Sequence, residues 1–331
     1  QLLVSHTYEH KIGPVDVEAG QATTLWPTAL DLAGLAVDPA RGQTYATDSA
    51  GRLRVFDSET DELLATLPGA GRIAVDSAHG RIYTGGEGAD RVRVFDTDRL
   101  QETGQILTRA HPVADAYNGG LYLIRSGVYV ASLDTMTVTG AISDTLPQSP
   151  GFSPNPAAID AVVDAGSGRT YAIINNGVPG SNNGNALHVY DTETYEKTLS
   201  DGERSPFYVD VDPGSGRAYV SRAHMTSRST SLLEDGRRYS ARLEAVFGPL
   251  RVDPGLGTLY LSVRGIEEGY LLVLDAGNLD VLGSVPIPGG FDLRALDPQR
   301  HLLYLATPDG RVQVWSANGG SLPARAEAVR A

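Results

Sequence analysis

Three basic residues fall within one short segment of a strongly acidic chain. Arg222, His224 and Arg228 occur in SRAHMTSRST. Guanidinium groups bind carboxylates, sulfates and phosphates through paired, charge-assisted hydrogen bonds, so this segment is a candidate anion-binding site. The alternative is a solvated loop whose arginines pair with nearby Glu234 or Asp235, because charge clusters are usually surface features.

Asparagine and glycine dominate a second candidate segment, which reads NNGVPGSNNGN over Asn175–Asn185. The side chains of Asn175, Asn176, Asn182 and Asn183 can both donate and accept hydrogen bonds, and glycine lets a partner approach the backbone closely. Carbonyl oxygens of such a loop can also hold Ca²⁺. The segment contains no Asp or Glu, however, so an ordinary turn-rich loop is favoured and no cofactor is expected.

The sequence carries no clear catalytic or metal-binding pattern. The seven histidines show no spacing that would place two metal ligands together in a regular element. No glycine-rich segment fits a phosphate-binding loop, and no GxSxG sequence occurs. We therefore expect a non-catalytic binding or scaffold protein, with no catalytic residue and no metal ligand. The alternative is a lactonase- or lyase-like hydrolase with a site in an axial pocket, for which fold analogy is the sole argument.

Charge and composition narrow the classes of partner. The formal net charge of -13 disfavours nucleic acid and anionic lipid. The absence of Cys excludes disulfides, thiolate metal sites and thioether-linked haem. No run approaches the roughly 18 apolar residues of a membrane span. Because the chain starts at Gln1, not Met, we expect an exported protein with an extracytoplasmic location.

One sequence repeat organises most of the chain. Each copy has an apolar stretch that ends in Asp, a Gly- or Pro-containing turn, and a Tyr seven positions after the Asp. The aspartates are spaced at 38 to 49 positions, a period typical of β-propeller blades. The seven aspartates are Asp38, Asp76, Asp115, Asp164, Asp212, Asp253 and Asp297, and the matching tyrosines are Tyr45, Tyr83, Tyr122, Tyr171, Tyr219, Tyr260 and Tyr304.

A second element follows the first in most copies and completes a four-stranded unit. RVRVFD at Arg91–Asp96 is typical of it, and LLEDG at Leu232–Gly236 is the weak match in the fifth copy. Alternating Val, Leu and aromatic residues predict a strand here. We interpret each Asp as a turn residue whose carboxylate accepts backbone N–H groups, and each Tyr as a packing residue between blades. The chain is therefore predicted to be all-β: a seven-bladed β-propeller of four-stranded antiparallel blades.

The DPxxGxxYV and VxVxDxxT elements resemble the YVTN type of β-propeller repeat. The resemblance covers about Leu32–Ser316, and YATD at Tyr45–Asp48 comes close to the Tyr-Val-Thr-Asn string, which no copy contains intact. Repeats of this type occur in bacterial and archaeal extracytoplasmic proteins. The resemblance implies architecture and location, and it implies little about function.

The whole chain, 1–331, is predicted to be one propeller domain. Residues 1–31 are expected to supply a closing strand and lead-in, 32–316 the seven repeats, and 317–331 a C-terminal tail. We expect Leu2–Tyr8 (LLVSHTY) to form the outer strand of blade seven and close the ring, since the C-terminal SLPARAEAVRA is poor strand material. The alternative is that the C-terminal segment forms this strand itself.

Length variation among the repeats points to one face of the ring. We call the turn face the side that carries the connections from first to second and from third to fourth strand. The loop face carries the connections from second to third strand and the crossovers between blades. The long insertions are expected on the loop face of blades three to six, including Pro147–Pro156. Loops on a rigid scaffold commonly recognise partners, so this sector is predicted to bind a protein or glycan, and a larger cell-surface assembly is one candidate partner.

Overall fold

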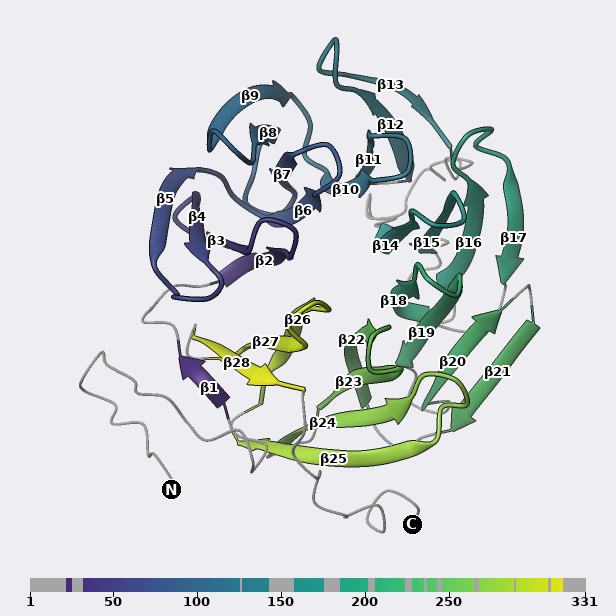
Figure 1. Cartoon of the computed structure of the whole chain (residues 1–331). Coiled ribbons are helices and arrows are strands. Elements are labelled where there is room, and N and C mark those ends of the chain that lie inside the picture. Colours follow the sequence, from purple (N-terminus) through teal and green to yellow (C-terminus); the bar gives the residue numbers. More distant parts are fainter. Residues whose placement is uncertain are drawn as a thin grey trace, which may run out of the picture.

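A computed structural model gives the fold as a β-propeller (Figure 1). The part of the chain that the structure describes comprises residues 22–25, 32–125, 127–142, 158–175, 185–201, 206–223, 228–234, 237–242, 246–264, 268–288, 290–308 and 311–317. These residues form seven four-stranded antiparallel sheets arranged around a central axis. None of the described elements is a helix with the length and apolar character needed to cross a membrane.

Six of the blades are made of four consecutive strands, ordered from the axis outwards. The strands of blades one to three are β2 (Leu32–Asp38), β3 (Gln43–Asp48), β4 (Arg52–Asp57), β5 (Leu63–Pro68), β6 (Arg72–Asp76), β7 (Arg81–Gly85), β8 (Val92–Asp96), β9 (Gln101–Ile106), β10 (His111–Asp115), β11 (Gly120–Ile124), β12 (Val128–Ser132) and β13 (Thr137–Ala141). Those of blades four to six are β14 (Ala158–Asp164), β15 (Arg169–Asn175), β16 (Asn185–Asp191), β17 (Lys197–Asp201), β18 (Pro206–Asp212), β19 (Arg217–Ala223), β20 (Arg228–Glu234), β21 (Arg237–Arg242), β22 (Val246–Asp253), β23 (Thr258–Arg264), β24 (Glu268–Asp275) and β25 (Val281–Pro288).

The remaining sheet combines both ends of the chain, and it corrects the predicted closure. Its strands, from the axis outwards, are β26 (Asp292–Asp297), β27 (Leu302–Ala306), β28 (Val312–Ser316) and β1 (Ala22–Leu25). The prediction that Leu2–Tyr8 pairs with the last strand was wrong, because β28 has β1 as its outer neighbour; Leu2–Tyr8 lies outside the described residues.

The position of β1 has a physical reason. Only positions 26–31 separate β1 from β2, and a short connection costs less conformational entropy to close than the longer one from Tyr8. The short ATTL segment also carries two β-branched threonines, which suit an extended strand. In blade five, the third strand β20 (Arg228–Glu234) contains the first three residues of the predicted LLEDG segment and begins four residues before it.

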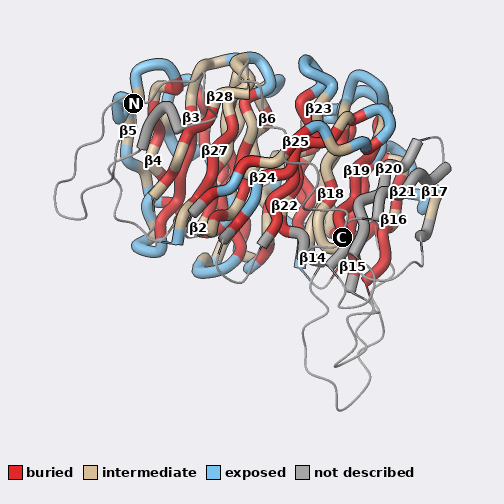
Figure 2. The backbone as a smooth tube through the Cα atoms, turned by 90° about the horizontal axis from the view of Figure 1, so that it is seen from below, coloured by how far each residue is buried: buried red, intermediate tan, exposed pale blue. Residues whose placement is uncertain are grey.

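Every junction between neighbouring blades has its own apolar core. Tyr45 packs with residues of blades one and two, and Tyr83 with residues of blades two and three. The series continues around the axis to Tyr304, whose core joins blade seven to Leu35 and Phe56 of blade one. All seven recurrent tyrosines are at most 4% exposed, which confirms that they are packing residues. Figure 2 shows the same division, with buried positions along the strands and exposed ones at the connections.

The recurrent aspartates are turn residues, as predicted. The Asp38 carboxylate accepts the backbone N–H of Ala40 at 3.1 Å, and the Asp297 carboxylate accepts that of Gln299 at 2.9 Å. In the other repeats the aspartate likewise accepts a backbone N–H from two residues later, or from three residues later in the case of Asp76. A carboxylate that caps its own turn satisfies buried backbone donors. The turn face is therefore nearly uniform, and the strands that it joins are held in one register.

Candidate functional site

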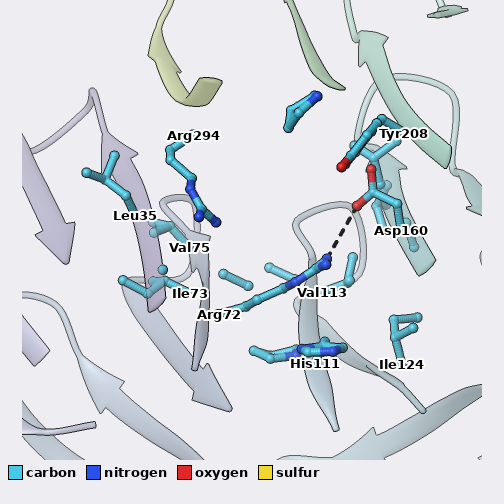
Figure 3. A pocket seen from close by; sticks show the side chains of 18 of the residues that line it. Leu35, Arg72, Ile73, Val75, His111, Val113, Ile124, Asp160, Tyr208 and Arg294 are labelled. Carbon is cyan, nitrogen blue, oxygen red and sulfur yellow. Dashed lines mark ion pairs between the residues drawn. The ribbon is translucent and has the colours of Figure 1, made fainter. Parts of the chain in front are cut away.

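A cavity of about 400 Å³ lies on the axis and is lined by the innermost strand of each blade (Figure 3). This volume is in the range of small-molecule sites. Much of the wall is small or apolar, for example Ala33, Ile73 and Val113. Charged and polar side chains interrupt this wall, and Figure 3 shows Arg72, Asp160, Tyr208 and Arg294 around the same space.

The repeat explains how these side chains come together. Arg72, His111, Asp160 and Tyr208 each lie four positions before the recurrent aspartate of their own blade. They therefore occupy equivalent places on β6, β10, β14 and β18, which are successive inner strands. Four copies of one repeat position thus build one arc of the cavity wall.

Two of the polar residues bind the inner strands to one another. The Asp160 carboxylate of blade four accepts the backbone N–H of Val209 in blade five at 3.1 Å. The Asp210 carboxylate of blade five accepts that of Val252 in blade six at 2.9 Å. Charge-assisted hydrogen bonds of this kind are stronger than neutral ones, so both aspartates stabilise the ring.

Arg251 continues this series from blade six to blade seven. Its guanidinium donates to the carbonyl oxygens of Leu250 at 2.7 Å and of Arg294 at 2.8 Å. Both hydrogen bonds go to backbone, and one of them crosses the blade junction. Arg251 is therefore mainly a structural cation.

Arg72 and Arg294 have fewer of their N–H donors engaged in hydrogen bonds. Arg72 has a side chain that is 48% exposed, and its Nη1 lies 3.7 Å from the Asp160 carboxylate, beyond hydrogen-bond distance. Arg294 makes a 3.4 Å contact from Nη2 to Asp292, while its Nε is buried without a hydrogen-bond partner. In Figure 3 both guanidinium groups point into the cavity.

The enclosed charges shift one another's pKa values. Removal from water raises the pKa of Asp160, and the nearby Arg72 and Arg251 oppose this rise. Burial also raises the pKa of Asp210. Burial lowers the pKa of Arg294, with Arg72 and Arg251 adding to the decrease by like-charge repulsion. These pKa shifts indicate that Arg72, Arg251 and Arg294 influence ionisable groups around the same cavity.

His111 is kept neutral at the same wall. Burial, with a smaller contribution from the positive charge of Arg72, lowers the pKa of His111 to about 4. Its Nδ1 is buried and has no hydrogen-bond partner. A side chain on Gly86, which has a φ of 104°, would collide with this Nδ1. The ring of His111 is therefore packed against backbone on one edge.

The residues expected from the sequence to bind a partner lie elsewhere, on the loop face. Asn175 pairs with Asn185 at the end of the β15–β16 ladder. Arg222 pairs with Ser229 and Arg228 with Ala223, so adjacent strands bring these two arginine backbones together. The side chains of Asn175, Arg222 and Arg228 are not described, and Asn176, Asn182, Asn183 and His224 lie outside the described residues, as does most of the proposed calcium loop.

Sequence reasoning missed the axial residues, although the repeat holds a signal for them. Blades one, two and seven have alanine opposite the recurrent tyrosine, whereas blades five and six have Asp210 and Arg251 there. Blades three and four have valine at this place, so a charge where the other copies have alanine or valine marks a departure from packing alone. Among the described residues, no group of three or more His, Asp or Glu is arranged to hold a metal ion.

The loop face is uneven because some second strands are longer than others. In blades four to six the second strand continues four residues beyond its tyrosine, and in the other blades it continues two or three. At about 3.3 Å per residue, the difference extends the rim over blades four to six by roughly 3–7 Å. The predicted insertions of blades five and six are thus partly paired strand. The strands concerned end at Asn175, Ala223 and Arg264, compared with Asp48, Gly85, Ile124 and Ala306.

Comparison with known proteins establishes the fold class alone. No protein-family model matches the sequence, and no curated protein matches it significantly. A chain of a mitotic checkpoint complex is similar over 96% of this chain and 98% of its own length, with 11% identity and a TM-score of 0.71. The β-propeller domain of Cps50 (Swd1) from Myceliophteria thermophila is similar over 89% and 99%, with 12% identity and a TM-score of 0.69.

A chain of hydrazine synthase from Kuenenia stuttgartiensis is also similar. It matches over 95% of this chain and 99% of its own length, with 15% identity and a TM-score of 0.66. The three similar structures come from different kinds of protein, as expected for an architecture that hosts many functions. The chain is a β-propeller, and its function has to be argued from its own residues.

Proposed function

We propose that this chain is a non-catalytic binding protein that recognises a protein partner on its loop face, over blades four to six. The observation that carries this proposal is the extended rim of these blades. Extended hairpins offer a partner both side chains and a shaped edge, while the turn face offers a set of similar capped turns. Recognition sites are commonly placed on the variable side of such a repeat array.

The ring beneath this rim supports the proposal because it is well suited to hold a binding surface in place. Each blade shares an apolar core with both of its neighbours. A preorganised surface loses less conformational entropy when a partner binds. A propeller of similar fold belongs to the mitotic checkpoint complex, which is consistent with a role in assembly.

An extracytoplasmic location is part of the proposal. It is supported by the resemblance of the repeat to the YVTN type and by the net charge of -13. A glycan partner is the competing outcome. Protease treatment of the captured material separates the two, because binding of a glycan persists after proteolysis and binding of a protein does not.

The test compares two tyrosines of similar exposure on opposite faces. Tyr270 lies near the loop-face end of β24 and is 39% exposed, and Tyr117 lies in a turn-face connection and is 43% exposed. The immobilised chain is used to capture proteins from the cells that produce it. Tyr270→Ala should weaken the capture of a specific protein at least about fivefold, since interface tyrosines are often hot spots, and Tyr117→Ala should leave it unchanged. Equal loss with both variants, or no protein retained beyond an unrelated propeller, would overturn the proposal.

A further inference from the structure

We propose that the axial cavity is a binding site for a carboxylate group, held between Arg72 and Arg294. This inference goes beyond the protein-binding function and does not depend on it. The carboxylate can belong to a free small organic acid or to an acidic side chain that a partner inserts. Both sources present the same chemistry to the two guanidinium groups.

The inference rests on N–H donors of the two arginines that make no hydrogen bond among the described residues. A guanidinium has five N–H donors and matches the two oxygens of a carboxylate in a planar, paired geometry. Within the described residues, the side chain of Arg72 makes no hydrogen bond and has only the 3.7 Å contact with Asp160. Arg294 makes one long contact with Asp292 and leaves its Nε buried and unpaired. Because this Nε is shielded from the cavity, the Nη atoms of Arg294, whose side chain is 34% exposed, are the donors that a carboxylate in the cavity can reach.

Arg251 shows what a purely structural arginine looks like in the same cavity. Its two Nη atoms donate to backbone carbonyls at 2.7 and 2.8 Å. Arg72 and Arg294 have no comparable pair of backbone acceptors among the described residues. The contrast separates the cation that stabilises the ring from the two that remain available for a ligand.

The wall between the two arginines leaves room for a ligand. Blade one separates blade two, which carries Arg72, from blade seven, which carries Arg294. It lines the cavity there with Ala33, Gly34 and Leu35, of which the first two project little or no side chain. Figure 3 shows the guanidinium groups of Arg72 and Arg294 directed into the shared space. The volume of about 400 Å³ accommodates a small acid or a single inserted side chain.

The negative charge of Asp160 limits how much negative charge a ligand can bring to the site. It lies 3.7 Å from Arg72 and keeps one oxygen on the Val209 N–H. Its negative charge repels a second carboxylate and competes for Arg72. Asparagine at this position keeps an oxygen for the Val209 N–H while it removes the charge. Asp160→Asn is therefore expected to strengthen carboxylate binding while the blade contact is retained.

The test is calorimetric titration of the whole chain with succinate, with a hexaglutamate peptide and with inorganic phosphate. Arg72→Gln and Arg294→Gln should each weaken carboxylate binding about tenfold or more, because each removes charge-assisted hydrogen bonds. Arg99→Gln is the matched control, since Arg99 is 76% exposed in a turn-face connection and the substitution changes the net charge equally. It should leave the affinity unchanged, and thermal unfolding shows whether each variant is folded.

The outcomes show where the carboxylate comes from and whether the site binds a carboxylate at all. Binding of succinate supports a free acid, and binding of the peptide alone supports an inserted side chain. An increase in affinity of about threefold or more with Asp160→Asn supports the site even if an arginine variant fails to fold. No saturable binding of either carboxylate probe, equal weakening by Arg99→Gln, or binding of phosphate alone would overturn the inference. If succinate binds but no protein is captured, the protein-binding proposal fails while this inference stands.

Discussion

The Thr44 hydroxyl of blade one donates to the Tyr304 hydroxyl of blade seven at 3.4 Å, across 260 positions of sequence. Both side chains are buried. The contact lies beside the apolar core that Tyr304 shares with Leu35 and Phe56. The first and last blades are therefore packed against each other as the other neighbours are.

The Tyr304 contact gives a direct prediction for stability. Tyr304→Ala removes a buried aromatic ring from the junction and should lower the free energy of unfolding by about 3–5 kcal/mol. Tyr304→Phe keeps the ring and should cost about 1 kcal/mol. Urea denaturation measures both, with Tyr117→Ala on the exposed surface as the control, expected within about 1 kcal/mol of the wild type. A Tyr304→Ala protein as stable as this control would contradict a shared core at this junction.

The strand β1 gives a second prediction through a pair of truncations. Removal of residues 1–25 deletes the partner of β28, including the Thr24↔Val314 and Leu25↔Gln313 pairs. Removal of 1–21 leaves β1 in place. The longer truncation should be less stable by about 2 kcal/mol or more and more prone to associate, because it loses several backbone hydrogen bonds and exposes an edge strand. Thermal unfolding and light scattering check this. Two truncations of equal stability would argue against β1 as the closing strand.

Gly86 gives a third prediction, with a matched control two residues away. Gly86→Ala imposes both a positive φ and a collision with His111, whereas Gly88→Ala imposes a positive φ with open space around the new methyl group. We expect losses of about 2–4 kcal/mol for Gly86→Ala and about 1 kcal/mol for Gly88→Ala. Chemical denaturation measures the difference between them. Equal losses would show that His111 moves without cost.

His111 predicts a pH dependence of stability. Its pKa is lowered to about 4 in the folded chain from an ordinary value of 6.5. The unfolded chain therefore binds the proton first, and stability that is present above pH 6.5 is lost as the pH falls towards 4. Between pH 7 and pH 5 the wild type should lose about 1–2 kcal/mol more than His111→Gln. Asp160 and Asp210 have raised pKa values and contribute with the opposite sign.

Urea denaturation at several pH values tests this prediction. His79→Gln is the control, because His79 is partly exposed and lies on the turn face, with its Nδ1 2.9 Å from the Asp76 carboxylate. Identical pH profiles for the wild type and His111→Gln would contradict the burial of a neutral imidazole beside Arg72.

The sequence predicts the repeat architecture well because each copy carries the same local pattern, a turn Asp followed seven positions later by a packing Tyr. The turn aspartates and packing tyrosines, such as Asp38 and Tyr45, do in the structure what their spacing indicates. The closing strand is harder to predict. Leu2–Tyr8 and Ala22–Leu25 both have strand-like composition, and the choice between them depends on connection length and on pairing with a strand at the other end of the chain.

The axial site is less predictable than the blades. Arg72 and Arg294 belong to different repeats and lie at different distances from their aspartates, so no local pattern links them. Only closure of the ring brings them to one cavity. Alignment of the seven copies against one another marks Asp210 and Arg251 as departures from alanine or valine. It does not reveal that Arg251 is hydrogen-bonded to backbone while Arg72 is available.

Hydrogen–deuterium exchange, measured with and without the captured partner, tests the proposed binding surface most directly. We expect slower exchange at the loop-face ends of the β15–β16 and β19–β20 hairpins, where Asn175 pairs with Asn185 and Ala223 with Arg228. Exchange at the turn-face connections after Asp38 and Asp76 should not change. Protection confined to the turn face, or to outer strands such as β5, would rule out the loop face of blades four to six as the binding surface.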